Sequence, residues 1–147
     1  MLLVETSRKA GPMMLNRHPG YRAPILATSL GQVYLAFGPQ EEREAVLVQE
    51  SEKPDSWNDI ARDTAKAITF FDDIRKRGYA AMHPDYSRIE YRHSMTSLGV
   101  PIMSDNKVFA SINVLYLKKA LTQEQAVKAM LKPLQATARQ IAQELER

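Results

Sequence analysis

The chain has 147 residues, of which 44% are hydrophobic and 25% charged, and its formal net charge is +3. This composition is typical of one globular domain with a core of its own. The sequence contains no apolar run long enough to span a membrane, and the absence of cysteine excludes disulfides and thiolate metal sites. These features favour the cytoplasm. Because Lys and Arg do not form a dense cluster, we expect no direct DNA contact by this chain.

Two short strands and a loop are expected at the N-terminus. Residues 1–6 and residues 13–16 are apolar enough to be strands, and Gly11-Pro12 forms a turn between them. Glycine and proline then interrupt any regular pattern over residues 20–24, which predicts a loop.

A helix is predicted near residues 27–37, where apolar side chains recur with helical spacing. Thr28 and Ser29 stand where an N-cap belongs. Gly31 is a poor helix former, so its place just inside the helix indicates close packing of the backbone against a neighbour.

Two more helices are expected in the middle of the chain. The first covers about residues 40–49, and the second begins with Ser56 as its N-cap and ends at Gly78. The second helix has a predicted buried stripe of Ile60, Thr64, Ala67, Ile68, Phe71 and Ile74. A short strand follows at residues 79–82, and the polar residues 83–95 are interpreted as an irregular loop.

The last part of the chain predicts two strands and a helix. The strands cover about residues 96–103 and 108–117, with a turn at Asp105-Asn106-Lys107. The helix starts at Thr122, with Gln125 completing a capping box, and a proline at position 133 is expected to kink or split it. The order of elements favours an α+β fold, in which helices cover both faces of an antiparallel sheet.

Alternation assigns small and polar side chains to one face of the two late strands: Ser97, Gly99 and Pro101 in the first, and Ser111, Asn113 and Leu115 in the second. A three-residue turn would put the two sets on the same face of the sheet, whereas a four-residue turn would separate them. Such a face leaves room for a small ligand and offers hydrogen bonds to it. The alternative is a face packed tightly by a helix.

The predicted helix start at Thr28-Ser29-Leu30 is a second candidate. Its free N–H groups and the helix dipole favour an anion such as a carboxylate, and Arg22 is near enough in sequence to pair with the same anion. The alternatives are an ordinary N-cap and a surface arginine. The charged residues at positions 88, 92 and 93 form either a lid or a solvated loop.

Catalytic patterns are absent from the sequence. His18, His83 and His93 lack the spacing of a metal-binding pair. There is no G-x-S-x-G elbow and no phosphate-binding glycine-rich loop. We therefore expect no metal, no cofactor and no enzyme activity.

Residues 20–37 resemble the "G-Y-R-x-P-x-x-A-T-x-x-G-x-x-x-L-A" signature of the effector-binding domain of IclR-type transcriptional regulators. Three further segments are similar to the family in order and spacing. Arg77-Gly78-Tyr79-Ala80 resembles "R-G-Y-A", residues 98–102 resemble "I-A-A-P-V", and residues 108–114 resemble "V-x-A-A-l-s-v".

The resemblance implies one effector-binding domain over residues 1–147 with a GAF-like fold, and a winged helix-turn-helix domain that is absent from this chain. DNA would be bound only through that missing domain. The effector would be a small organic acid. The tyrosines at positions 79, 86 and 91 favour the branch that activates aromatic-acid catabolism.

The family's ligand contacts would fall on Leu15, Ala23, Ser29, Leu30, Pro101, Asn113 and Leu115. Arg22 and Ser97 join this set from the residue patterns described above. The family also implies a homo-oligomer, a dimer or a tetramer. The alternatives for function are an oligomerisation module without a ligand and a small enzyme.

Overall fold

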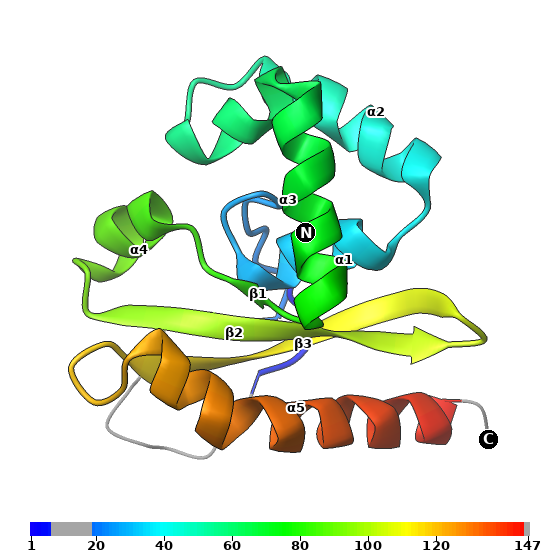
Figure 1. Ribbon diagram of the computed structural model, residues 1–147, viewed down its shortest axis with the longest axis vertical. Helices are drawn as coiled ribbons and strands as arrows, with labels where there is room; N and C mark the ends of the chain where they lie inside the picture. Colours follow the sequence, from blue (N-terminus) through cyan, green and yellow to red (C-terminus); the bar gives the residue numbers. More distant parts are fainter. Residues whose placement is uncertain (7–18, 146–147) are drawn as a thin grey trace.

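An antiparallel sheet lies between two layers of helices in the computed structural model, which describes residues 1–6 and 19–145 (Figure 1). In this part of the chain the sheet has three strands in the order β1 (Ala80–Ala81), β2 (Met95–Ser104) and β3 (Lys107–Leu117). The α+β class and the helices on both faces are therefore confirmed.

The hairpin between β2 and β3 is tighter than predicted. Asp105 and Asn106 have φ values of 49° and 60°, the left-handed conformation that a two-residue hairpin turn requires. Lys107 already pairs with Ser104, so the prediction of a three-residue turn was wrong.

A β-bulge restores the register that a three-residue turn would have produced. Ile102 pairs with Ala110, but Met103 pairs with Val108, so Phe109 is one extra residue in β3. Beyond the bulge the predicted face is confirmed by three cross-strand pairs: Ser97 with Leu115, Gly99 with Asn113, and Pro101 with Ser111.

The opposite face of the sheet packs on α5 (Gln123–Leu145), where Val100 and Ile102 meet Leu134 and Ala138. The predicted capping box is confirmed: Thr122 N donates to Gln125 Oε1 at 2.8 Å, and Gln125 N donates to Thr122 Oγ1 at 3.2 Å.

Of the two outcomes expected at Pro133, a kink or a split of the last helix, the split is wrong, because α5 runs through Pro133. Proline has no N–H, so the carbonyl oxygen of Ala129, four residues earlier, lacks its helical hydrogen bond. Ala129 and Pro133 are both exposed. Water can therefore satisfy that carbonyl, which lowers the cost of the missing hydrogen bond.

The face with small and polar residues packs on α1 (Ser29–Phe37). Thr28 caps this helix by accepting a hydrogen bond from Gly31 N at 3.2 Å. A Cβ atom on Gly31 would lie 1.9 Å from the Ile25 carbonyl oxygen, and one on Gly99 would lie 2.7 Å from the Ser29 carbonyl oxygen. The close backbone packing predicted at Gly31 is confirmed.

After α2 (Gln40–Ser51), the predicted single helix is two elements: η1 (Ser56–Arg62), a 3-10 helix, and α3 (Thr64–Arg77). Asp63 has an extended backbone and caps α3 by accepting from Lys66 N at 3.0 Å. Ser56 does not cap a helix but donates to Asp85. Ile68, predicted to be buried, is 58% exposed because the separate helices have different buried faces.

The predicted irregular loop over residues 83–95 contains a helix, α4 (Pro84–Tyr91). His83 Nδ1 accepts from Asp85 N at 3.2 Å and so caps α4, while Pro84 occupies the first helical turn. The predicted strand at residues 1–6 is reduced to one antiparallel bridge between Leu2 and Arg22. The predicted strand at residues 13–16 lies outside the described residues.

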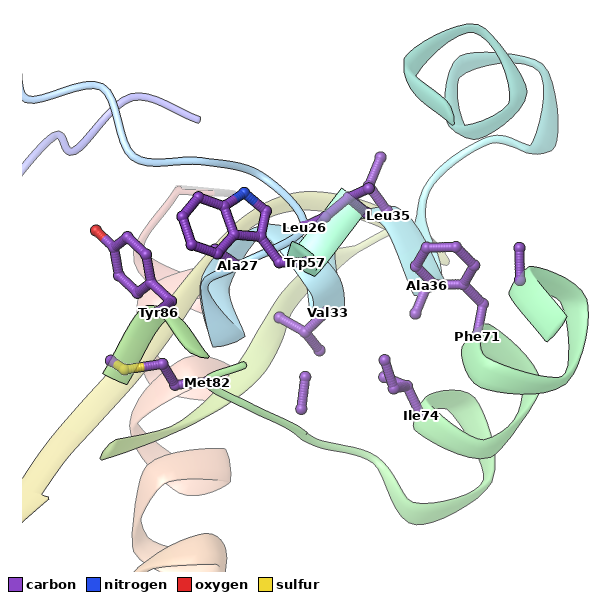
Figure 2. Close-up of a cluster of buried hydrophobic side chains, with 12 residues drawn as sticks. Leu26, Ala27, Val33, Leu35, Ala36, Trp57, Phe71, Ile74, Met82 and Tyr86 are labelled. Atoms are coloured by element: carbon purple, nitrogen blue, oxygen red, sulfur yellow. The ribbon is translucent and has the colours of Figure 1, made fainter. Parts of the chain in front are cut away.

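A hydrophobic core fills the space between α1, α3 and η1 (Figure 2). Trp57 of η1 is 8% exposed, and its ring meets the Tyr86 ring edge-on with 5.5 Å between the centroids. This contact joins η1 to α4. The predicted glycine ending of α3 is confirmed, since Gly78 has a φ of 76°.

Replacing Gly31 with alanine is expected to destabilise the domain by about 3 kcal/mol or more, because the new methyl group would overlap backbone rather than a movable side chain. Urea unfolding measures the change. Gly38→Ala is the matched control, because its nearest atom would be the Tyr34 carbonyl oxygen at 3.0 Å and its loss should be much smaller. Equal losses for the two variants would contradict the close packing at Gly31.

Candidate functional site

Three polar side chains from distant parts of the sequence meet at the start of α1. Ser29 Oγ and Ser97 Oγ share a hydrogen bond of 2.7 Å, and Asn113 Nδ2 donates to Ser29 Oγ at 3.4 Å. Ser29 and Ser97 are fully buried, whereas Asn113 is half-buried. We call Ser29, Ser97 and Asn113 the polar cluster. The structure thus brings together three of the predicted ligand-binding residues.

The backbone at the start of α1 adds hydrogen-bond donors next to the polar cluster. The N–H groups of Ser29 and Leu30 lie in the first turn, where a helix offers them no acceptor. The Leu30 carbonyl oxygen accepts from Ser111 Oγ at 3.0 Å, which fastens this turn to β3. The positive end of the helix dipole therefore lies against the sheet beside the cluster.

Part of the sheet face that was predicted to leave room for a ligand is filled by α1 instead. Gly99 touches the backbone of Ser29, so α1 fills the space above it. At this position the alternative of tight helix packing is correct. Pro101 and Leu115 lie on the same face at opposite ends of the paired stretch, and both are half-buried.

Arg22 and Ala23 lie at a different place, beside a cavity of about 510 Å³ between their loop, α2 and η1. Neither Ser29 nor Asn113 lines this cavity. The structure therefore does not join Arg22 to the start of α1 as the sequence suggested. Leu15, the remaining predicted site residue, lies outside the described residues.

Two features of this cavity were not predicted. Lys53 Nζ lies 2.5 Å from the Glu50 carboxylate, which is largely buried. Asn58 is fully buried, and neither its side-chain nitrogen nor its side-chain oxygen has a hydrogen-bond partner in the described part of the chain. The i, i+3 spacing of Glu50 and Lys53 is a sequence signal for their ion pair, whereas no sequence pattern signals the buried Asn58.

A second cavity, of about 420 Å³, lies between η1, α3 and α4, and we call it the Trp57–His83 cavity. Its lining consists of Leu26, Ser56, Trp57, Asp59, Ile60, Phe70, His83 and Asp85. The sequence offered His83 as a possible metal ligand without suitable spacing, and no capping role was predicted for it. The sequence does carry a signal for the capping role of His83. Pro84 follows it, and a proline in the first helical turn marks the preceding residue as a candidate N-cap.

The environment of His83 favours a neutral imidazole. Burial lowers the pKa of His83 below its ordinary value of 6.5, against the opposing effect of the carboxylates of Asp85 and Asp59. The cap also requires an unprotonated Nδ1. The proton of the neutral ring is then on Nε2.

Within residues 1–6 and 19–145, no group of three or more His, Asp or Glu side chains is placed to hold a metal ion. A search of the same residues finds no helix with the length and apolarity needed to cross a membrane.

The family description "Bacterial transcriptional regulator IclR C-terminal" matches residues 1–143 of the chain. Among solved structures, the transcriptional regulator YaiJ superposes with a TM-score of 0.74 at 23% identity, over 98% of this chain and 78% of that one. HmgR of Pseudomonas aeruginosa gives a TM-score of 0.71 at 23% identity, over 97% of this chain and 54% of that one. IclR of Thermotoga maritima gives 0.69 at 23% identity, over 95% and 53%. The chain therefore spans about half the length of the last two proteins.

We expect the fold to lose stability as the pH falls from about 7 to about 5.5, in part because of His83. The unfolded chain binds a proton at this residue near pH 6.5, whereas the folded chain binds it only at lower pH. The stability contributed by the neutral ring is therefore present above pH 6.5 and is lost as the pH falls toward the folded pKa. Urea unfolding at a series of pH values measures this loss.

His83→Asn is the matched variant, because asparagine keeps a capping acceptor but does not titrate. Its stability should therefore fall less than that of the wild type over the same pH interval. Parallel stability curves for the two proteins would contradict the assignment.

Proposed function

This chain belongs to the IclR C-terminal family of bacterial transcriptional regulators, and we propose that it is the part of such a regulator that binds a small organic acid. In this proposal the acid changes how the regulator acts on DNA, and the DNA is contacted by another part of the regulator. The modest net charge of +3 supports this division of roles.

The observation that carries the proposal is the meeting of the α1 start with the polar cluster. The N–H groups of Ser29 and Leu30 and the helix dipole favour a negative charge. Asn113 uses one side-chain N–H on Ser29, so its second N–H and its carbonyl oxygen can face a ligand. We assign the ligand's carboxylate to this group of donors.

The rest of the ligand would lie along the half-buried apolar side chains of the same sheet face. Leu115 packs against the main core cluster, and Pro101 lies farther along β2. We propose these two residues as apolar walls for an aromatic or short aliphatic body. Arg22 and Ala23 line a separate cavity, so we assign them no contact with the carboxylate.

We also propose that the regulator associates through this domain. β3 is an edge strand of the sheet in the described part of the chain, and Phe109 at its bulge is 63% exposed. An exposed aromatic side chain on an edge strand favours contact with another protein surface. This surface also supports the alternative function, an oligomerisation module that binds no ligand.

Benzoate or a short aliphatic carboxylate is expected to raise the melting temperature of the wild-type chain, whereas the matching carboxamides should raise it less. A ligand at 100 times its Kd adds roughly 2.7 kcal/mol of stability. Asn113→Leu should weaken acid binding about tenfold or more, because a hydrogen bond to a charged group contributes about 1.5–3 kcal/mol. A thermal-shift titration measures both effects.

Thr96→Val is the matched control, because Thr96 lies on the opposite face of β2 and should bind the acid as the wild type does. Three results would count against the proposal: no response to any acid, equal responses to acids and carboxamides, or chemical turnover of the stabilising compound. The first would favour the oligomerisation module.

The molar mass in solution tests the proposed association. Light scattering during gel filtration should give the wild-type chain a mass above that of one chain, and Phe109→Ser should shift the mass toward one chain. A monomeric wild type, or an unchanged mass in the variant, would remove Phe109 from the interface.

A further inference from the structure

We infer that Arg43 of α2 and Arg75 of α3 are positioning residues of the proposed acid site, on which they act through the far end of α1. Both side chains reach the carboxyl end of this helix, whereas the ligand's carboxylate is assigned to its amino end. The two ends are about 13 Å apart, because α1 has nine residues. The inference rests on the proposed function and adds to it two residues that do not touch the ligand.

The carboxyl end of α1 cannot satisfy its own carbonyl groups. Pro39 has no N–H, so the carbonyl oxygen of Leu35, four residues earlier, lacks its helical hydrogen bond. Leu35 and Ala36 are each 1% exposed, so water has little access to their carbonyl groups. The last turn of α1 contains no basic residue that could supply donors. Donors therefore have to come from other elements.

Two arginines from the neighbouring helices supply these donors. Arg43 Nη1 donates to the Leu35 carbonyl oxygen at 3.0 Å and to the Gly38 carbonyl oxygen at 3.3 Å. Arg75 Nη1 donates to the Ala36 carbonyl oxygen at 2.7 Å. We call these three contacts the arginine clamp. The clamp joins the end of α1 to both α2 and α3.

Each guanidinium group of the clamp is itself held by a neighbour in α3. The group of Arg43 lies over the Phe71 ring, 5.7 Å from the ring centroid, and Arg75 Nη2 pairs with Asp72. Burial lowers the pKa of Arg43, and the nearby charge of Arg75 lowers it further. The carboxylates of Glu44 and Asp72 oppose this effect. The clamp therefore brings two positive charges to the negative end of the helix dipole.

The clamp affects the acid site because α1 is fastened at both ends. At its start, the Ser29 backbone lies directly against Gly99 of β2. Without the clamp, α1 could tilt about this contact, which would move the N–H groups of Ser29 and Leu30 relative to Asn113. The clamp thus sets the direction in which these donors point. Its charges also offset the negative end of the dipole, which would otherwise oppose a bound anion.

The experiment compares the affinities of the full chain for benzoate and benzamide by isothermal titration calorimetry. Arg43→Met and Arg75→Met should each lower the ratio of the two affinities by about threefold or more, because the N–H donors move and the helix end loses a charge. A loss of stability alone would weaken both ligands alike and leave the ratio unchanged. An unchanged ratio in both variants would overturn the inference.

Arg62→Met is the matched control, because it also removes one positive charge and one arginine cap. Arg62 donates to the carbonyl oxygens of Ser51 and Lys53, which lie at the end of α2 and not of α1. This variant should keep the wild-type ratio of affinities. A fall in Arg62→Met equal to that in the clamp variants would show a general effect of losing an arginine, and would contradict the inference.

A second readout needs no ligand and separates this inference from the proposed function. In two-dimensional NMR spectra of the free proteins, the backbone amide signals of Ser29 and Leu30 and the side-chain amide signals of Asn113 should shift in the clamp variants, but not in Arg62→Met. If the wild type binds no benzoate, the proposed function fails, and these signals alone decide whether the clamp positions α1. Unmoved signals would overturn the inference. Arg75→Lys replaces Arg75→Met if the latter does not fold, since one lysine nitrogen cannot reproduce the two-nitrogen contact and should still shift the signals.

Discussion

The direct contact of the α1 backbone with the sheet is the constraint on which the other features depend. It is possible because Gly99 has no side chain at the point where the Ser29 carbonyl approaches the sheet. Gly31 likewise has no side chain where the Ile25 carbonyl of the preceding loop packs against the first turn of α1. Any larger residue would lift the helix from the sheet. The contact brings the first N–H groups of α1 within reach of side chains on β2 and β3, and so creates the polar cluster.

The loop that precedes α1 also connects this contact between helix and sheet to η1 and α4. The N–H of His83 donates to the Ala27 carbonyl oxygen at 2.9 Å, one residue before the cap of α1. Leu26 lines the Trp57–His83 cavity, and Trp57 lines both cavities. The polar cluster and the Trp57–His83 cavity are therefore linked through one short segment, and both depend on its position.

The sequence predicted the sheet face well because alternation along β2 and β3 survives local irregularity. The turn was wrong by one residue, but the bulge at Phe109 compensated, since a hairpin must keep its apolar face on α5. Elements without strong periodicity were missed. In the sequence the apolar spacing continues from η1 into α3, but Asp63 separates the two helices and their buried faces differ. The start of α4, a short polar helix, is set by His83 and Pro84. Asn58 and the two cavities depend on packing between distant segments, which no local pattern encodes.

The most direct test of the acid site is the response of individual amide groups to a bound carboxylate. In a two-dimensional NMR titration of the labelled chain with benzoate, the amide signals of Ser29 and Leu30 and the side-chain amide of Asn113 should shift most, and should follow one binding curve. The largest shifts at Arg22, Lys53 and Asn58 instead would place the acid in the cavity under the loop. That result would contradict the assignment of the carboxylate to the start of α1.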